Sequence, residues 1–216
     1  MTMGKTVKTR TLPLAAVALV SFATSPAWAS PLTTLKQRTD RIAQLLKQST
    51  TEGTAPHARK KASMKKIVRA FLDYQELAKR SLWMHWKERK SSERKEFVQL
   101  LRQLIEDRVL SNLTSNAEFT VEYGETTEDG GEAAVKTVVR IPDKPEIEME
   151  YKFSKRSGRW MIYDLITDGT SLVRNYRSQF NRIIQRDGYP QLVRKMRDKL
   201  KNSESSGQVA SALVAG

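Results

Sequence analysis

The sequence of 216 residues contains no cysteine and only two histidines. The lack of cysteine excludes disulfide scaffolds, thiolate zinc sites, iron–sulfur clusters, thiol catalysis and cysteine-linked lipid anchors. His57 and His85 stand in separate segments, without a second histidine or a carboxylate at metal-ligand spacing, so the sequence predicts no metal site. Glycine-rich loops of the kind that cradle nucleotide phosphates after a strand are also missing. The sequence therefore carries none of these catalytic or cofactor-binding motifs.

Acidic residues are few compared with basic ones: 24 Asp and Glu stand against 38 Lys and Arg, which gives a net charge of +14. The basic residues are spread over all the expected helices. A nucleic-acid-binding surface instead gathers them in one stripe with aromatic residues between them. We therefore expect no nucleic-acid partner. Two interpretations of the charge stay open, namely a solvated surface and attraction to anionic membranes or acidic proteins.

No hydrophobic run in the sequence is long enough to cross a bilayer. One apolar run, residues 12–22, follows three basic residues and precedes an Ala-Trp-Ala sequence at residues 27–29. A positive segment, a short apolar run and an A-x-A site are the three parts of a secretory signal peptide. We predict a signal peptide over residues 1–29, with cleavage just before Ser30. The mature protein is then expected to be soluble, exported to the periplasm and untethered.

Apolar residues recur with the 3.6-residue period of amphipathic helices on both sides of a central segment. Helices are expected at residues 32–51, 57–71, 73–86, 91–109, 170–187 and 192–200. In the central segment the period changes to 2, which is typical of strands. Strands are expected at residues 119–123, 135–141, 147–153 and 160–166. Short turn sequences join these strands, and short connections require antiparallel pairing.

This order of elements predicts the α+β fold class: a four-stranded antiparallel sheet covered by N-terminal and C-terminal helices. A single domain over residues 30–201 contains all of these elements. The remaining residues, 202–216, are rich in Ser, Gly and Ala and show no hydrophobic period, so we expect a disordered tail there.

Two segments of the sequence resemble a known family. The first is Phe-Leu-Asp-Tyr-Gln-Glu-Leu-Ala-Lys-Arg-Ser-Leu at residues 71–82, followed by Trp86 and Phe97-Val98. The second is Trp-Met-Ile-Tyr-Asp-Leu-Ile at residues 160–166, followed by Gly169, Ser171-Leu172-Val173 and Asn-Tyr-Arg-Ser-Gln-Phe at residues 175–180. Together they resemble the MlaC family, the toluene-tolerance auxiliary proteins of an ABC transporter. The resemblance spans about residues 32–200, and it departs from the family where Trp83 replaces a usual glycine and Asp168 a usual glutamate.

The resemblance implies a cystatin- or NTF2-like fold in which the sheet and the helices enclose a hydrophobic cavity for acyl chains. It implies a periplasmic phospholipid carrier, with a phospholipid as its ligand and no other cofactor. Members of the family shuttle lipid between an outer-membrane lipoprotein and porin complex and the substrate-binding ring of an inner-membrane ABC transporter. The resemblance thus links the chain to outer-membrane lipid asymmetry and solvent tolerance.

A lipid carrier needs an apolar cavity, because each methylene exposed to water costs about 0.8 kcal/mol. The apolar face of the expected strands offers one side of such a lining: Val135, Val139, Met149, Tyr151 and Ile162. The apolar faces of the expected helices would oppose it: Leu101, Leu104, Ile105, Val173, Tyr176 and Phe180. The alternative for each of these residues is a place in a filled core.

Two other functions stay open. One is an NTF2-like enzyme that acts on a small hydrophobic substrate through Asp164 with Tyr163 or Tyr151. No histidine or second carboxylate stands near Asp164, and Arg177 is a candidate partner for it in a structural ion pair, so we expect no enzyme. The other is a cargo-free periplasmic adaptor that docks an acidic partner through its basic surface.

Overall fold

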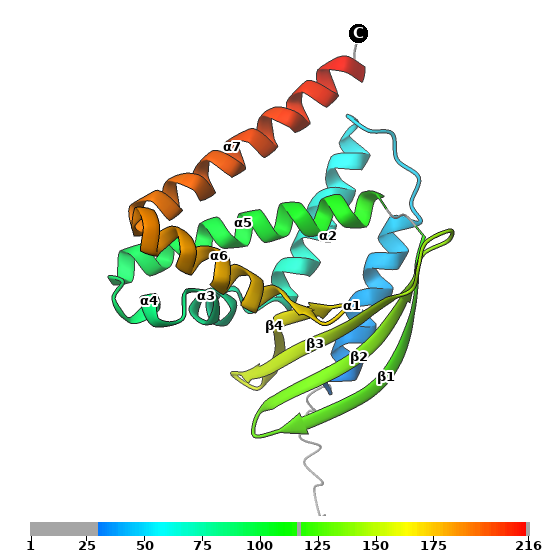
Figure 1. Cartoon of the computed structure of the whole chain (residues 1–216). Helices are drawn as coiled ribbons and strands as arrows, with labels where there is room; N and C mark the ends of the chain where they lie inside the picture. The colour runs from blue at the N-terminus through cyan, green and yellow to red at the C-terminus, as the bar shows by residue number, and fades with distance from the viewer. Residues whose placement is uncertain (1–29, 116–117, 215–216) are drawn as a thin grey trace, which may run out of the picture.

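The computed structural model describes residues 30–115 and 118–214 (Figure 1). The predicted signal peptide, residues 1–29, lies outside the described residues. The helices are α1 (Pro31–Leu46), α2 (Ala55–Phe71), α3 (Tyr74–Leu82), α4 (Met84–Lys87), α5 (Ser91–Ser115), α6 (Leu172–Asp187) and α7 (Tyr189–Val214). The strands are β1 (Thr120–Asp129), β2 (Glu132–Arg140), β3 (Ile147–Arg156), β4 (Arg159–Thr167) and β5 (Thr170–Ser171). The expected α+β class is confirmed.

The strands form one sheet in the order β1-β2-β3-β4-β5, and every neighbouring pair is antiparallel. The turn between β1 and β2 needs two glycines, since Gly130 and Gly131 have φ values of 55° and 87°, in the left-handed region that two-residue hairpin turns require. The sheet has five strands instead of the expected four. The additional strand, β5, is only two residues long, which is too short to show a period of 2 in the sequence.

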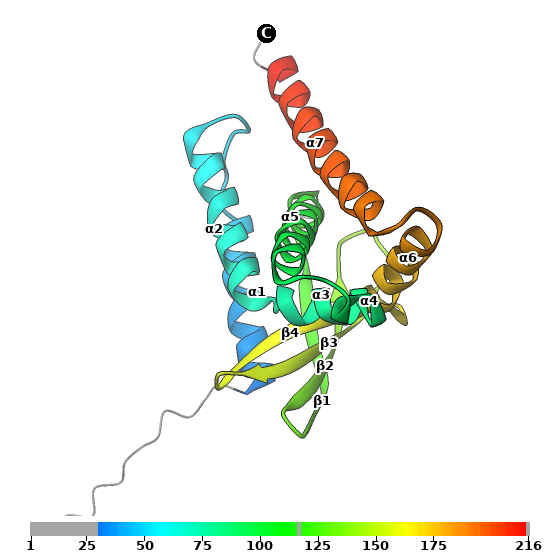
Figure 2. The same cartoon turned by 90° about the vertical axis from the view of Figure 1, so that its left-hand side faces the viewer.

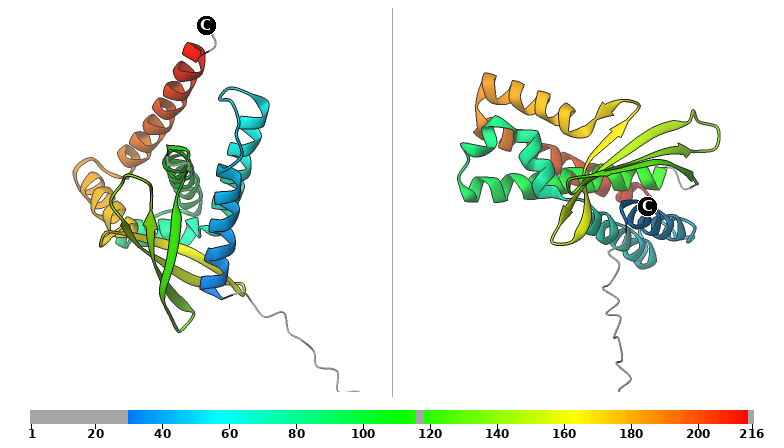
Figure 3. Two further views of the ribbon diagram at one scale, coloured as in Figure 1. Left: turned by 90° about the vertical axis from the view of Figure 1, so that its right-hand side faces the viewer. Right: turned by 90° about the horizontal axis from the view of Figure 1, so that it is seen from below.

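The sheet is curved, and its concave face is turned toward the helices (Figure 3). The register shifts between Tyr123 and Thr126 in β1 and between Lys152 and Phe153 in β3. Such bulges increase the local twist of a strand. α1 packs against β1 and β2, whereas α3 and α6 pack against β4 at the other end of the sheet. The helices therefore cover the same sheet at two separate places.

Three hydrophobic clusters hold these layers together. The largest fills the space among α3, α5, α6 and α7. In it the ring of Phe97 meets the ring of Phe180 edge-on, with 5.4 Å between the ring centres. A second cluster joins α1 to the sheet through Leu35 and Phe153. A third joins α1, α2 and α5 through Leu45, Met64 and Leu110 and other residues. The core is thus divided, and the division leaves room between the second and third clusters.

Several helix ends differ from the expected positions; α5, for example, ends at Ser115 and not at residue 109. α1 ends at Leu46 rather than near residue 51, because the polar residues that follow offer no side chain to bury. α7 continues through residues 202–214, where the composition predicts a disordered tail. That stretch contains no proline to end a helix. Its last turns project away from the other elements (Figures 1 and 2), and no helix of the described residues is long and apolar enough to cross a membrane.

The helix expected at residues 73–86 is divided at Trp83. Asp73 caps the first part, α3, by accepting the backbone N–H of Glu76 at 3.0 Å, as the sequence predicts. Trp83 then adopts φ 50° and ψ −116°, a backbone conformation that favours glycine. The chain turns there, and the short α4 begins at Met84. The residue type at this position does not predict the break, because tryptophan is not a turn residue.

Replacing Trp83 with glycine should stabilise the protein. A non-glycine residue in such a conformation costs about 1–3 kcal/mol, which glycine would relieve. Glycine also has more conformational freedom in the unfolded chain, and this offsets part of the stabilisation. We expect the free energy of unfolding to rise by about 1 kcal/mol, measured by urea denaturation. Trp83→Ala is the matched control, because alanine has the same difficulty with positive φ. A gain in the alanine variant as large as in the glycine variant would assign the effect to the indole instead.

Candidate functional site

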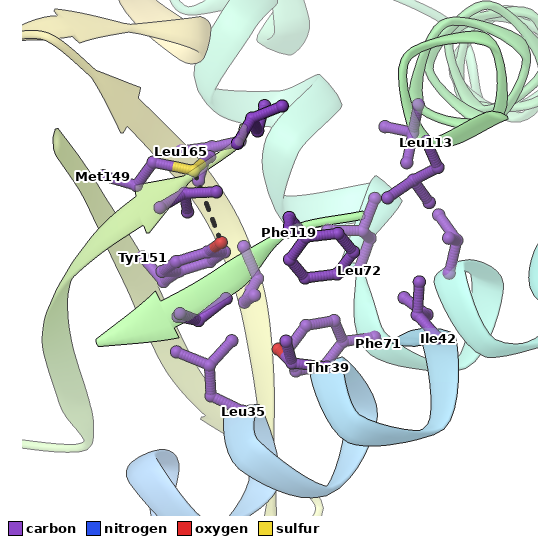
Figure 4. Close-up of a pocket in the computed structure, with 16 residues that line it drawn as sticks. Leu35, Thr39, Ile42, Phe71, Leu72, Leu113, Phe119, Met149, Tyr151 and Leu165 are labelled. Atoms are coloured by element: carbon purple, nitrogen blue, oxygen red, sulfur yellow. Dashed lines mark hydrogen bonds between the residues drawn. The ribbon is translucent and has the colours of Figure 1, made fainter. Parts of the chain in front are cut away.

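An apolar pocket of about 300 Å³ lies between the sheet and three helices, α1, α2 and the C-terminal part of α5 (Figure 4). From α1 it takes Leu35, Thr39 and Ile42, whose spacings of four and three residues place them on one helix face. Phe71, the last residue of α2, and Leu72, which follows it, also belong to the lining. The volume is at the lower end of the roughly 300–1,000 Å³ range of small-molecule sites.

The sheet supplies the other wall of the pocket. Tyr151 on β3 is paired with Leu165 on β4, so both side chains point to the same face of the sheet. Val139 on β2 and Met149 on β3 extend this face, and Phe119, just before β1, lies across from Ile42 (Figure 4). The pocket therefore has walls from helices early in the chain and from the strands that follow them.

Hydrogen-bonding side chains are scarce in this pocket. The hydroxyls of Thr39 and Tyr151 supply them, and no charged residue belongs to the lining among the described residues. The Tyr151 hydroxyl donates to the sulfur of Met149 at 3.6 Å, and burial raises the pKa of Tyr151 to about 12. The lining is thus neutral at physiological pH. It suits an apolar ligand, because an ionic group placed here would lose its hydration without gaining a partner.

Four of the eleven residues that the sequence suggests for a lining do face this pocket: Val139, Met149, Tyr151 and Ile162. Val135 lies on the same sheet face, but it is completely buried in the cluster between α1 and the sheet. The structure therefore places four of the five suggested strand residues in the pocket wall and the fifth in the filled core. Whether these four residues contact a lipid stays a prediction.

The six suggested helix residues lie elsewhere, away from this pocket. Leu101, Ile105, Val173 and Phe180 are buried in the cluster among α3, α5, α6 and α7, and Leu104 and Tyr176 pack against it. The ring of Tyr176 stacks on that of Phe180 at 5.2 Å. These faces are filled by one another because α6 packs on α3 and α7, and α7 packs on α5.

The α1 and α2 residues of the pocket are absent from the suggested lining. Leu35, Ile42 and Phe71 do stand on the apolar faces that the sequence predicts for these helices. The periodicity shows that such a face is buried, but it does not show which partner buries it. That α1 and α2 cover the sheet is a property of the chain's topology.

The comparisons with known proteins agree with this geometry. A family model for the MlaC protein matches residues 36–198. The chain belongs to the MlaC family. Its fold is similar to that of the phospholipid-binding protein from Ralstonia solanacearum, solved in complex with a phospholipid, with a TM-score of 0.69 and 18% sequence identity over 82% of this chain and 99% of that chain. A search of curated proteins gives no match.

The two segments that carry the MlaC resemblance contact each other in the structure. Leu72 forms a parallel bridge with Ile162 on β4, and the backbone N–H of Asp73 donates to the carbonyl of Ile162 at 2.7 Å. The carboxylate of Asp73 also accepts from Arg156 on β3 at 2.9 Å. Since Leu72 and Ile162 both line the pocket, this junction fixes one of its walls.

Asp164 has a structural place in this MlaC fold. Its carboxylate is buried and accepts three hydrogen bonds, from the Ser171 hydroxyl at 2.6 Å and from the backbone N–H groups of Val173 and Leu165, each at 2.9 Å. The suggested partner Arg177 instead donates to the carbonyl of Arg80 at 3.1 Å, so that suggestion was wrong. The backbone N–H groups of Leu165 in β4 and Val173 in α6, with the Ser171 hydroxyl, satisfy Asp164 without any cation.

The acid–base pair suggested as an alternative is not assembled around the pocket. Tyr163 donates its hydroxyl to Glu132 at 3.0 Å, and burial raises its pKa to about 12. Asp164 is occupied by Ser171 and the start of α6. Neither Asp164 nor Tyr163 belongs to the pocket lining, although the other suggested tyrosine, Tyr151, does. Within residues 30–115 and 118–214, no group of three or more His, Cys, Asp or Glu residues could hold a metal ion.

A buried carboxylate joins the two helices beside the pocket. The side chain of Glu106 on α5 has no exposed surface, and Arg69 on α2 donates to its two oxygens at 3.0 and 2.9 Å. Lys65 lies 3.6 Å and Arg102 3.9 Å from the same carboxylate. Arg69 follows Val68, and Glu106 precedes Val109 by three residues. Since Val68 and Val109 line the pocket, this ion cluster fixes the distance between two of its helices.

Proposed function

We propose that this chain is a periplasmic phospholipid carrier that holds acyl chains in the apolar pocket. It moves lipid between an outer-membrane lipoprotein and porin complex and the substrate-binding ring of an inner-membrane ABC transporter. The observation that carries the proposal is a pocket without charged lining residues, set between the sheet and the helices of an MlaC fold. The phospholipid in the Ralstonia solanacearum protein of similar fold supports it.

The energetics of the cargo support a pocket of this kind. An acyl chain of about 15 methylenes costs roughly 12 kcal/mol to expose to water. A carrier must offset this cost with a lining close in character to the bilayer interior, so that the lipid can leave as readily as it enters. Leu35, Phe71, Phe119, Met149 and other apolar residues provide that environment. The charged headgroup would remain outside the pocket in water, because the lining offers it no partner.

Native mass spectrometry of the chain from Ser30 onward, after exported expression, tests lipid binding. We expect a mass increment of one diacyl phospholipid that is released only on denaturation, and lipid extraction then identifies the headgroup. A protein that is found without lipid, and that also takes none from vesicles, would contradict the proposal and favour a cargo-free adaptor. The shuttling step is tested separately, by transfer of a labelled phospholipid from donor to acceptor vesicles. Lipid binding without any transfer would leave the chain a lipid-binding protein and refute the carrier role.

A further inference from the structure

Two adjacent large hydrophobic side chains are exposed at the junction of α3 and α4. Trp83 is 54% exposed and Met84 is 49% exposed, and these are the exposed large hydrophobic residues among those described. The junction lies at a corner of the fold, next to the start of α5 (Figures 1 and 2). The pocket lies toward the other end of α5, a helix of 25 residues and about 37 Å. The corner is therefore separate from the site of the proposed lipid binding.

The backbone conformation of Trp83 suggests that its exposed indole contacts a ligand or a partner. At φ 50° and ψ −116°, glycine would fit without strain and a large side chain does not. The indole gains little inside the fold in return, since half of it is exposed and its ring contact is the Arg177 guanidinium, 5.5 Å from the ring centre. Strained residues of this kind are found where a side chain meets a ligand or a partner.

The corner is held rigidly in place. The His85 Nε2 atom lies 2.9 Å from the side-chain oxygen of Asn181, which fixes α4 on α6. Arg94 donates to the backbone carbonyls of Trp86 and Lys87 at 3.0 and 3.1 Å and closes α4 onto the start of α5. Trp83 and Met84 are thus presented at a fixed place, so that little conformational freedom is lost when they are covered.

The surroundings of the corner are strongly basic. Residues 79–90 contain five Lys and Arg against one acid, Glu88. The adjacent α6 contains four Arg against one acid, Asp187 at its end, which pairs with Arg186. Glu88 is already engaged by Arg89 at 3.1 Å. Within the part of the chain that the structure describes, the exposed side chains of Lys87 and Lys90 form no ion pair. An apolar tip with unpaired cations beside it matches an anionic surface that has an apolar layer beneath it.

We propose that Trp83 and Met84, with Lys87 and Lys90, form a docking site for the surface of a bilayer that contains anionic phospholipid. The indole and the thioether enter the interfacial layer, where tryptophan is the preferred aromatic residue, and the lysines meet the headgroup phosphates. A projecting corner suits a bilayer better than a protein, because a protein partner must supply a pocket of matching shape and a lipid surface adapts to the wedge. The site keeps the protein at the membrane surface.

Sedimentation with vesicles tests this site, using vesicles of phosphatidylcholine with and without phosphatidylglycerol. We expect the chain from Ser30 onward to bind the anionic vesicles, with a blue shift of tryptophan fluorescence. Trp83→Gly should weaken binding about tenfold and remove the shift, because Trp160 is buried and Trp86 is half-buried. It should leave lipid uptake in native mass spectrometry unchanged, which separates this site from the pocket.

A pair of charge variants completes the test. Lys87→Gln with Lys90→Gln should weaken binding about fivefold for each lysine. Lys61→Gln with Lys66→Gln removes the same charge from α2, remote from the corner, and should change binding far less. Equal losses in the two double variants, or binding that is indifferent to Trp83→Gly, would overturn the proposal in favour of a general attraction by net charge. A failure to bind anionic vesicles would also overturn it and would leave an acidic protein as the partner.

Discussion

Replacing Val139 with tryptophan should reduce the lipid carried by the purified protein to about a tenth or less. Val139 lies on the helix-facing side of β2 and is half-buried in the pocket wall, so a larger side chain there extends into the pocket and not into a filled core. In a pocket of about 300 Å³, an indole takes up a substantial part of the space for an acyl chain. Each methylene that is displaced from the pocket forfeits about 0.8 kcal/mol of binding free energy.

The neighbouring residue provides the matched control. Val138 lies on the opposite face of the same strand, beside Glu122 and Glu148, so Val138→Trp adds the same bulk outside the pocket. Native mass spectrometry of both variants gives the lipid occupancy, and circular dichroism confirms the fold. Full loading of Val139→Trp, or equal losses in the two variants, would show that the acyl chains lie elsewhere.

The sequence was sufficient to predict the α+β class, four of the five strands and which strand residues share one face of the sheet. The period of 2 placed Val139, Met149 and Tyr151 on one side of the sheet, and pairing with the neighbouring strands keeps them there. The order of the strands followed from short turns, since a connection of a few residues can join only antiparallel strands. These features depend on residues close together in the chain, and such residues leave a local pattern.

The helix side of the pocket could not be predicted in the same way. Phe180 and Leu35 both stand on apolar helix faces, yet Phe180 is buried against Phe97 within the helical layer and Leu35 faces the sheet. Their periodicity is the same, and only the path of the chain decides which helix covers which strand. The break at Trp83 was missed for a different reason, because its backbone conformation contradicts the preference of its residue type.

The ion cluster on Glu106 gives the second large expected effect. Removing one partner of a buried ion pair costs about 3–5 kcal/mol, because the other charge stays buried without compensation. Lys65 and Arg102 remain near Glu106, so we expect Arg69→Met to lower the free energy of unfolding by about 3 kcal/mol, the low end of that range. For a chain of this size, the melting temperature should fall by roughly 6–12 °C.

Replacing the other partner, Glu106, should cost less stability than replacing Arg69. This difference tests whether the stranded carboxylate causes the loss. The side chain of Arg69 is 50% exposed and can turn to water when its partner is lost, whereas the side chain of Glu106 has no exposed surface. Glu106→Leu should therefore destabilise less than Arg69→Met, and the double variant should recover much of the loss, as apolar replacements of buried pairs do. Thermal unfolding of the three variants decides the order. If Glu106→Leu lowered the melting temperature more than Arg69→Met, burial of an unpaired carboxylate would not explain the loss of stability.

The same variants connect stability to the proposed function. Arg69 and Glu106 join α2 to α5 next to Val68 and Val109, which line the pocket from the two helices. Loss of the pair should let these helices separate, so that Arg69→Met releases bound lipid to acceptor vesicles faster than the unaltered protein at a temperature where both are folded. The double variant, with its helices again in apolar contact, should retain lipid nearly as well as the unaltered protein. Equal release rates in all three proteins would mean that the pocket walls do not depend on this ion cluster.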